Sequence, residues 1–507
     1  MKYHGSKQHK LKSRIIKWLA IAVLASGAAW MLLTSASLRR VSFTFTVDDP
    51  ARFTALELAA PKELHGWTLN GQPVPVPFAG MQYEKIPAIP ARLLVRGKNI
   101  LRVAAPLLPQ FIPHPDVQLA GEPFDLTPHY SWFKVRLAGL TAATPCLFTI
   151  GPVLGFAGTD FFTVTCQTNM PVPVDLEVGG RVLESPAGAV HSWRVDGLQP
   201  GRDYDYRLSV VHPLTGKATI SGPHHVSTFG ADAEFTFAAC GDNRSNPEIW
   251  ARVAALIRSL HPAFFIHTGD MVKEGFIYDD WLREMFTPAA ELLANVPAYP
   301  VLGNHEYSDA VFQRMFQTPS GASNWEQLIG PAHIIGIDGG LDWRTDGKPY
   351  AWLNNVLSRS EAPFIFLVTH YPPFSSSHHG KMSGEEPGEP GEETARQIHD
   401  SILPLLVHHH VTAIIAGHSH SYERSELDGG VSLITTAGAG AGLMNKHENA
   451  QMQNPYSKIY VKAFNITVFQ IRGATCEMKA LDIDGTVLDT RTWQALRRQP
   501  QQAEPKN

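Results

Sequence analysis

Five short polar clusters carry residue types that bind metal ions, and each cluster follows directly on a short apolar run. The clusters, in chain order, are built from Asp242, Asp270, Asn304 with His305, His370, and His418 with His420. Short apolar runs bounded by turn residues are typical of buried strands. Because ligand sites in α/β proteins form at the carboxyl ends of strands, we expect these side chains to meet at one sheet edge. A glycine precedes four of the five clusters and lets the backbone turn sharply there.

The mixture of ligand types narrows the choice of metal. Carboxylate, imidazole and amide oxygen together suit zinc, iron or manganese and are too rich in nitrogen for calcium or magnesium alone. The ligands are too numerous for one tetrahedral ion, and a carboxylate can bridge two. Two neighbouring ions can bind both the attacking and the leaving oxygen of a displacement at phosphorus. The sequence therefore predicts two divalent or mixed-valence ions of iron, zinc or manganese in a site that hydrolyses phosphate esters.

The region that must position these clusters, residues 231–490, has the pattern of an α/β domain. Apolar strand candidates alternate there with helical stretches, which we predict at 247–260, 279–294 and 393–409. The predicted strands are residues 235–240, 263–268, 298–303, 333–338, 364–370 and 411–418. The last part, 458–490, is β-rich and contains an Asp-Gly turn.

Two β-rich regions precede this domain. Residues 41–120 show short strand-like runs broken by turns and predict a small β-sandwich. Residues 121–230 predict a second, immunoglobulin- or fibronectin-like β-sandwich, in which a tyrosine follows the turn at 198–201 and begins an alternating strand. At 507 residues, a chain of several domains is expected.

The first forty residues have the pattern of an export signal. Six lysines and arginines between Lys2 and Lys17 precede residues 18–33, which carry no charge. This run is 16 residues long, so a cleaved signal peptide and an uncleaved membrane anchor through residues 15–34 both remain open. We expect the body of the protein to be periplasmic, extracellular or anchored facing outside the cytoplasm. The other end, residues 491–507, reads as a polar tail.

Composition argues against nucleic acid as a partner. The formal net charge is −4, and no basic stripe occurs in the body of the chain. The four cysteines have no zinc-finger spacing, and only Cys146 and Cys166 form a plausible disulfide pair. Free buried thiols are the interpretation we favour slightly.

Two longer motifs carry a family resemblance. Gly303-Asn304-His305-Glu306 and Gly417-His418-x-His420-x-Tyr422-Glu423-Arg424 occur in this order and spacing. With the preceding clusters they resemble the calcineurin-like metallophosphoesterases, in their purple-acid-phosphatase-like branch, over roughly residues 151–489. The resemblance implies a multi-domain fold, in which N-terminal β-sandwich domains precede a metallophosphoesterase domain built as an α/β/β/α sandwich. It also implies that the domain at 121–230 is the immunoglobulin-like domain of that branch.

The resemblance also implies a role for each site residue. Asp270 would bridge the two ions, and Asp242 and His420 would complete one position. The other position would take Asn304, His370 and His418. His305 would contact the phosphate and help to protonate the leaving group, and Glu306 would orient His305.

The chain departs from the family pattern at two positions. Many members carry Asp-x-His in the first motif, where this chain has Arg244, and the purple enzymes carry a tyrosine where this chain has Lys273. Arg244 is a candidate clamp for a phosphate oxygen, and Lys273 would add positive charge nearby. His378 and His379 lie in a loop similar to one where the purple enzymes place substrate-facing histidines, so both are candidates for phosphate contact or proton donation.

We therefore expect an acid-phosphatase-like phosphomonoesterase that acts on a small-molecule phosphate ester through a metal-bound hydroxide. A nucleotidase or phosphodiesterase is the alternative within the enzyme class. From another class, a surface binding protein could carry an inactive phosphatase domain, but the complete ligand set argues against loss of activity.

Overall fold

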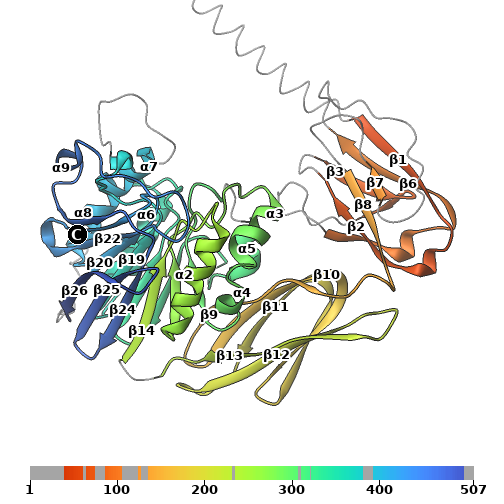
Figure 1. The fold of residues 1–507 in the computed structure, drawn as a ribbon, viewed down its shortest axis with the longest axis horizontal. Coiled ribbons are helices and arrows are strands. Elements are labelled where there is room, and N and C mark those ends of the chain that lie inside the picture. Colours follow the sequence, from red (N-terminus) through yellow and green to blue (C-terminus); the bar gives the residue numbers. More distant parts are fainter. Residues whose placement is uncertain are drawn as a thin grey trace, which may run out of the picture. The chain divides into compact units, whose positions relative to one another are not determined.

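The computed structural model describes residues 39–60, 64–74, 86–105, 124–126, 135–230, 234–306, 310–319, 321–380 and 392–495 (Figure 1). The predicted export segment, with its candidate anchor at 15–34, lies outside these residues. Within the described part of the chain, no helix is long and apolar enough to cross a membrane. Contacts divide the chain into two units, Met1–Phe78 with Lys85–Ala143 and Ala79–Glu84 with Thr144–Asn507.

The first unit contains two four-stranded antiparallel sheets around an apolar core that includes Leu56, Trp67 and Leu101. One sheet has the order β1 (Arg39–Val47), β6 (Gly97–Ala105), β3 (His65–Leu69) and β4 (Gln72–Pro73). The other has the order β5 (Ile86–Pro90), β2 (Phe53–Ala59), β8 (Val135–Thr141) and β7 (Phe124–Leu126). This unit extends past the boundary predicted at residue 120, because the central strand β2 pairs with β8 on one side and β5 on the other.

The second unit begins with one five-stranded sheet, whereas a sandwich of two sheets was predicted for residues 121–230. Long strands run through the whole sheet. Its strands are β9 (Phe148–Ala157), β10 (Phe161–Val178), β11 (Arg181–Asp196), β12 (Asp203–Val211) and β13 (Ala218–Ser227). β10 pairs with β9 along its first half and with β12 along its second, so it joins both parts into one sheet. The hydroxyl of Tyr204 accepts a hydrogen bond from the Gln199 backbone N–H at 2.8 Å, which fixes the corner expected at this turn.

The rest of this unit contains two large mixed sheets. The six-stranded sheet has the order β16 (Ala298–Pro300), β15 (Phe264–His267), β14 (Glu234–Cys240), β24 (Asn465–Arg472), β25 (Thr475–Asp482) and β26 (Val487–Gln494). The seven-stranded sheet has the order β17 (Trp325–Ile329), β18 (Ala332–Gly336), β19 (Phe364–Thr369), β20 (Ala413–Ala416), β22 (Ser432–Thr436), β21 (Tyr422–Glu426) and β23 (Ser457–Val461). Phe237 of the first sheet stacks on Phe469 with ring centroids 4.6 Å apart and meets Phe366 of the second sheet edge-on. Aromatic contacts thus join the two sheets face to face.

Helices cover the outer face of each sheet (Figure 1). Those on the six-stranded sheet are α2 (Pro247–Ser259), α3 (Tyr278–Asp280), a π-helical turn (Trp281–Phe286), α4 (Ala290–Leu293) and α5 (Ala310–Phe316). Those on the seven-stranded sheet are α6 (Lys348–Ser358), α7 (Glu392–Gln397), a π-helical turn (Ile398–Ile402) and α8 (Leu403–His408), and α9 (Ala450–Gln453) follows β22. The layers therefore run helix, sheet, sheet, helix.

The predicted helices agree with the structure to different degrees. α2 confirms the prediction at 247–260, and it begins where the Asn246 side chain accepts the Ile249 N–H. The stretches predicted at 279–294 and 393–409 each contain a π-helical turn. Strand β26 runs to Gln494, so the tail begins later than predicted. All four cysteines are buried and free, as favoured from the sequence.

Candidate metal centre

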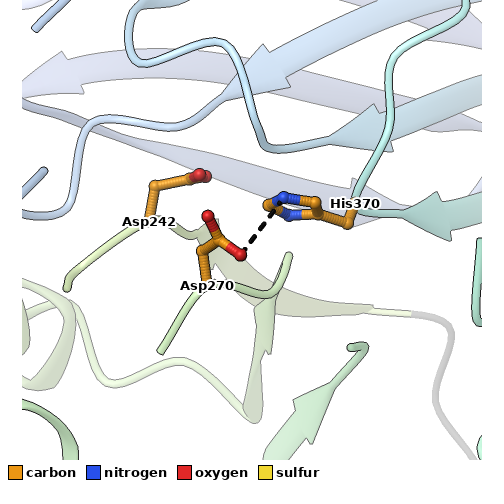
Figure 2. A group of neighbouring side chains, drawn as sticks. All are labelled: Asp242, Asp270 and His370. Carbon is orange, nitrogen blue, oxygen red and sulfur yellow. Dashed lines mark ion pairs between the residues drawn. The ribbon is translucent and has the colours of Figure 1, made fainter. Parts of the chain in front are cut away.

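The predicted ligands meet where the carboxyl ends of two groups of parallel strands approach each other. β14, β15 and β16 are parallel neighbours in one sheet, and β19 and β20 are parallel neighbours in the other. The loops after these five strands carry the five polar clusters. Figure 2 shows Asp242, Asp270 and His370 turned toward one another, and a ligand atom of each lies within 4.8 Å of the others.

Three of the predicted ligands have backbone φ angles in the left-handed region. The φ angles are 60° at Asp242, 56° at Asp270 and 67° at His418. A side chain in this conformation costs on the order of 1–3 kcal/mol, and such strain is concentrated at functional sites. The sharp turns bring the five loops to one place.

Two glycines allow the loops to approach this closely. A Cβ at Gly269, whose φ is +93°, would lie 2.9 Å from Nδ1 of His370. A Cβ at Gly417 would lie 2.7 Å from Oδ2 of Asp242. Any larger residue would therefore push the ligands apart.

In the half of the site formed by His370, Asn304 and Asp270, the facing atoms are all hydrogen-bond acceptors. Nδ1 of His370 donates to the Thr268 carbonyl at 2.8 Å, so Nε2 of the neutral ring is an acceptor. That Nε2 lies 3.1 Å from Oδ1 of Asn304 and 3.4 Å from Oδ1 of Asp270. Acceptors this close are held together favourably when a cation lies between them, so the donor set fits a metal ion.

His418 completes this half. Its Nε2 is buried and has no hydrogen-bond partner among the described residues. Burial, reinforced by the neighbouring imidazoles of His379 and His370, holds the pKa of His418 well below its ordinary value. Burial likewise lowers the pKa of His370. Both rings are therefore neutral and can offer a nitrogen lone pair to a metal.

The other half contains Asp242, His420 and Arg244. Both carboxylate oxygens of Asp242 lie 3.1 Å from the His418 backbone N–H. Nδ1 of His420 donates to the Gly442 carbonyl at 2.9 Å, and its Nε2 lies 3.5 Å from Oδ1 of Asp242. Nε of Arg244 lies 3.2 Å from Oδ2 of Asp270, and a terminal nitrogen lies 3.5 Å from Nε2 of His420. Arg244 thus contacts two of the three ligands predicted for this position.

Three acidic side chains are buried together at the site. Asp242, Asp270 and Glu306 are all buried, and Arg244 forms an ion pair with Asp270. Burial, and then the charge of Asp270, raise the pKa of Asp242 well above its ordinary value and that of Glu306 to about 8. Bound cations would supply the missing positive charge, so this electrostatic pattern also fits metal ions.

Glu306, which was expected to orient His305, makes other contacts in the structure. Its carboxylate accepts hydrogen bonds from the backbone N–H groups of Asp270, Met271 and Gly303, so it braces the loops that carry the ligands. His305 is oriented instead by the Lys273 carbonyl, which lies 2.7 Å from its Nδ1. The sequence does not indicate these partners of Glu306, since most of them are distant along the chain.

The remaining candidates for substrate contact are His378, His379 and Lys273. The His379 ring packs on His418 with centroids 4.1 Å apart, and His378 packs on His379 at the same separation. Sequence reasoning missed the anchor of this loop, the buried Glu423, which accepts the Ser376 backbone N–H at 2.9 Å. Lys273 is exposed, and its backbone N–H donates to Glu284 at 2.7 Å.

Comparison with known proteins identifies the class of this domain. Residues 235–422 match the family model for calcineurin-like phosphoesterases. The chain therefore contains a calcineurin-like metallophosphoesterase domain. The matched segment includes all five polar clusters.

Individual relatives of the chain include several purple acid phosphatases. The chain is 27% identical to purple acid phosphatase 23 of Arabidopsis thaliana, over 48% of this chain and 59% of that protein. It is 30% identical to the purple acid phosphatase of Glycine max, over 48% of this chain and 55% of that protein. The chain thus spans little more than half the length of these relatives. The structure of a purple acid phosphatase from yellow lupin (Lupinus luteus) shares the fold, with a TM-score of 0.58 at 15% identity over 89% of this chain and 95% of that one.

Proposed function

We propose that this chain is a dinuclear metal-dependent phosphoesterase, and specifically an acid-phosphatase-like phosphomonoesterase. The observation that supports this most strongly is the convergence of unprotonated ligand atoms from His370, Asn304 and Asp270. Beside them lies Nε2 of His418, for which the described residues offer no hydrogen-bond partner. Asp270 faces both halves of the site, since Oδ1 is turned to His370 and Oδ2 to Arg244. It is therefore our candidate for the bridging ligand.

The protein groups around the ligands suit phosphoryl chemistry. When bound, two cations would acidify a water molecule and neutralise charge on the phosphoryl oxygens. His305 places Nε2 3.9 Å from Oδ2 of Asp270, and its side chain is 20% exposed, so it can reach both the site and an entering substrate. We assign His305 to donate a proton to the leaving oxygen. Arg244 offers a guanidinium to a non-bridging phosphate oxygen.

A substrate panel tests this function. Purified protein loaded with Mn²⁺, Zn²⁺ or iron would be assayed with a phosphomonoester, a phosphodiester and a nucleoside monophosphate under identical conditions. We expect the highest kcat/KM with the simple phosphomonoester. A preference for the diester or the nucleotide would replace the proposal by the corresponding activity, and failure with every substrate at full metal content would favour a binding protein.

The protein is expected to lack purple colour even when loaded with iron. The colour in the resembled family comes from a tyrosinate bound to ferric iron, and this chain has Lys273 at that position. The neighbouring Tyr278 is buried in the core, where its hydroxyl receives a hydrogen bond from Gln167 at 2.7 Å. Burial raises the pKa of Tyr371, which keeps that phenol protonated. Visible absorption spectra with and without reductant would check this, and an intense band in the green that disappears on reduction would contradict it.

We also propose that the protein is exported, on the basis of the basic residues ahead of the uncharged segment 18–33. A reporter that is active only in an oxidising compartment, fused after Gln501, should be active in the full-length protein. Deleting residues 1–34 should abolish reporter activity. Equal activity of both fusions would show that this segment does not direct export.

A further inference from the structure

The two predicted metal positions differ in what surrounds their ligands. Nε2 of His370 faces Oδ1 of Asn304, and Nε2 of His418 has no hydrogen-bond partner within the described part of the chain. The ligands of the second position are in contact with a guanidinium instead. Arg244 lies 3.2 Å from Asp270 and 3.5 Å from His420, and its side chain is only 20% exposed.

The guanidinium carries a permanent positive charge at this second position. Arginine is not deprotonated in proteins, so its charge cannot be removed when a dication approaches. At separations of a few ångströms in a buried site, repulsion between the two cations is strong. The Arg244 side chain also engages Oδ2 of Asp270, one of the oxygens that the dication would need.

We propose that Arg244 competes with a metal ion for the second position, so that the two ions bind with unequal affinity. The first ion binds tightly through Asp270, Asn304, His370 and His418. The second binds well only when the guanidinium turns away from Asp270 and His420. A phosphate group gives the guanidinium an alternative partner, so phosphate strengthens binding of the second ion. This last step rests on the proposed function, whereas the unequal affinity does not.

Calorimetric titration with Mn²⁺ tests the proposal directly. We expect the wild-type protein to bind one ion tightly and a second at least about tenfold more weakly. Arg244→Ala should strengthen the second binding step by about tenfold or more, while Arg244→Lys, which keeps a positive charge, should leave it weak. Arg252→Ala, which removes an exposed arginine paired with Asp484, is the matched control and should behave as the wild type.

The role of phosphate is measured in the same titration. Inorganic phosphate should tighten the second step in the wild type and have a smaller effect in Arg244→Ala. Two equal sites in the wild type, or a second step that Arg244→Ala leaves unchanged or weakens, would overturn the competition. Circular dichroism of each variant verifies the fold. Unequal sites in a protein that hydrolyses no phosphoester would refute the proposed function and leave the competition standing.

Discussion

Replacing Asp270 by asparagine is expected to abolish phosphoester hydrolysis and to remove most of the bound metal. Oδ1 of Asp270 lies 3.4 Å from His370, and Oδ2 lies 3.2 Å from Arg244, so one carboxylate serves both halves of the site. The amide of asparagine carries no charge and offers one acceptor oxygen in place of two. Metal content per chain and the rate of phosphate release, measured on the same preparation, check the prediction.

Two outcomes separate this effect from general damage. Asp484→Asn changes an exposed aspartate far along the chain and should retain both metal and activity, which makes it the matched control. An Asp270→Asn protein with full metal content and nearly wild-type turnover would show that Asp270 is not the bridging ligand.

Replacing His305 by alanine should lower kcat by about 10²- to 10⁴-fold, the usual contribution of a positioned acid or base. Metal content should stay close to that of the wild type, because His305 is not one of the predicted ligands. Its Nδ1 donates to the Lys273 carbonyl at 2.7 Å, so Nε2 carries the transferable proton in the imidazolium form of the ring. The loss should be smaller for esters with good leaving groups such as nitrophenol, because these need no proton.

The leaving-group series decides what His305 does. A similar loss of kcat for nitrophenyl and alkyl phosphates would exclude proton donation, although binding of phosphate would remain. His225→Ala is a suitable control, since this exposed histidine lies on β13 and pairs with Asp205. It should change neither kcat nor metal content.

The gathering of the candidate ligands at one place could be predicted from the sequence because each follows a buried strand closely. Asp242 and Asp270 stand just after β14 and β15, and these strands are parallel neighbours. Parallel order brings their carboxyl ends to the same edge, so position along the chain was enough to bring the ligands together. The helix α2 was predictable for a similar local reason, since its cap at Asn246 and its apolar face lie within one stretch of sequence.

What could not be predicted depends on contacts between distant residues. Glu306 is adjacent to His305 in the sequence, yet its carboxylate turns to the backbone of Asp270 and Met271. Their neighbouring positions suggested a contact between the Glu306 and His305 side chains, but in the fold each side chain bonds to other groups. In the same way, β8 pairs with β2 across many intervening residues. Because of this pairing, the first unit ends at Ala143 and not at the predicted residue 120. Arg244 departs from the family pattern in the sequence, but its contact with Asp270 depends on how the two loops lie in the folded chain.

The central claim is that the cluster between Asp242 and His420 holds metal ions that hydrolyse phosphate esters. The most direct test is the rate of phosphate release from nitrophenyl phosphate after chelation and after stepwise return of Mn²⁺, Zn²⁺ or iron. We predict that chelation removes the activity and that returned metal restores it, with no restoration in Asp270→Asn. Activity that survives complete chelation, or that never appears in a folded and fully metal-loaded protein, would contradict the claim.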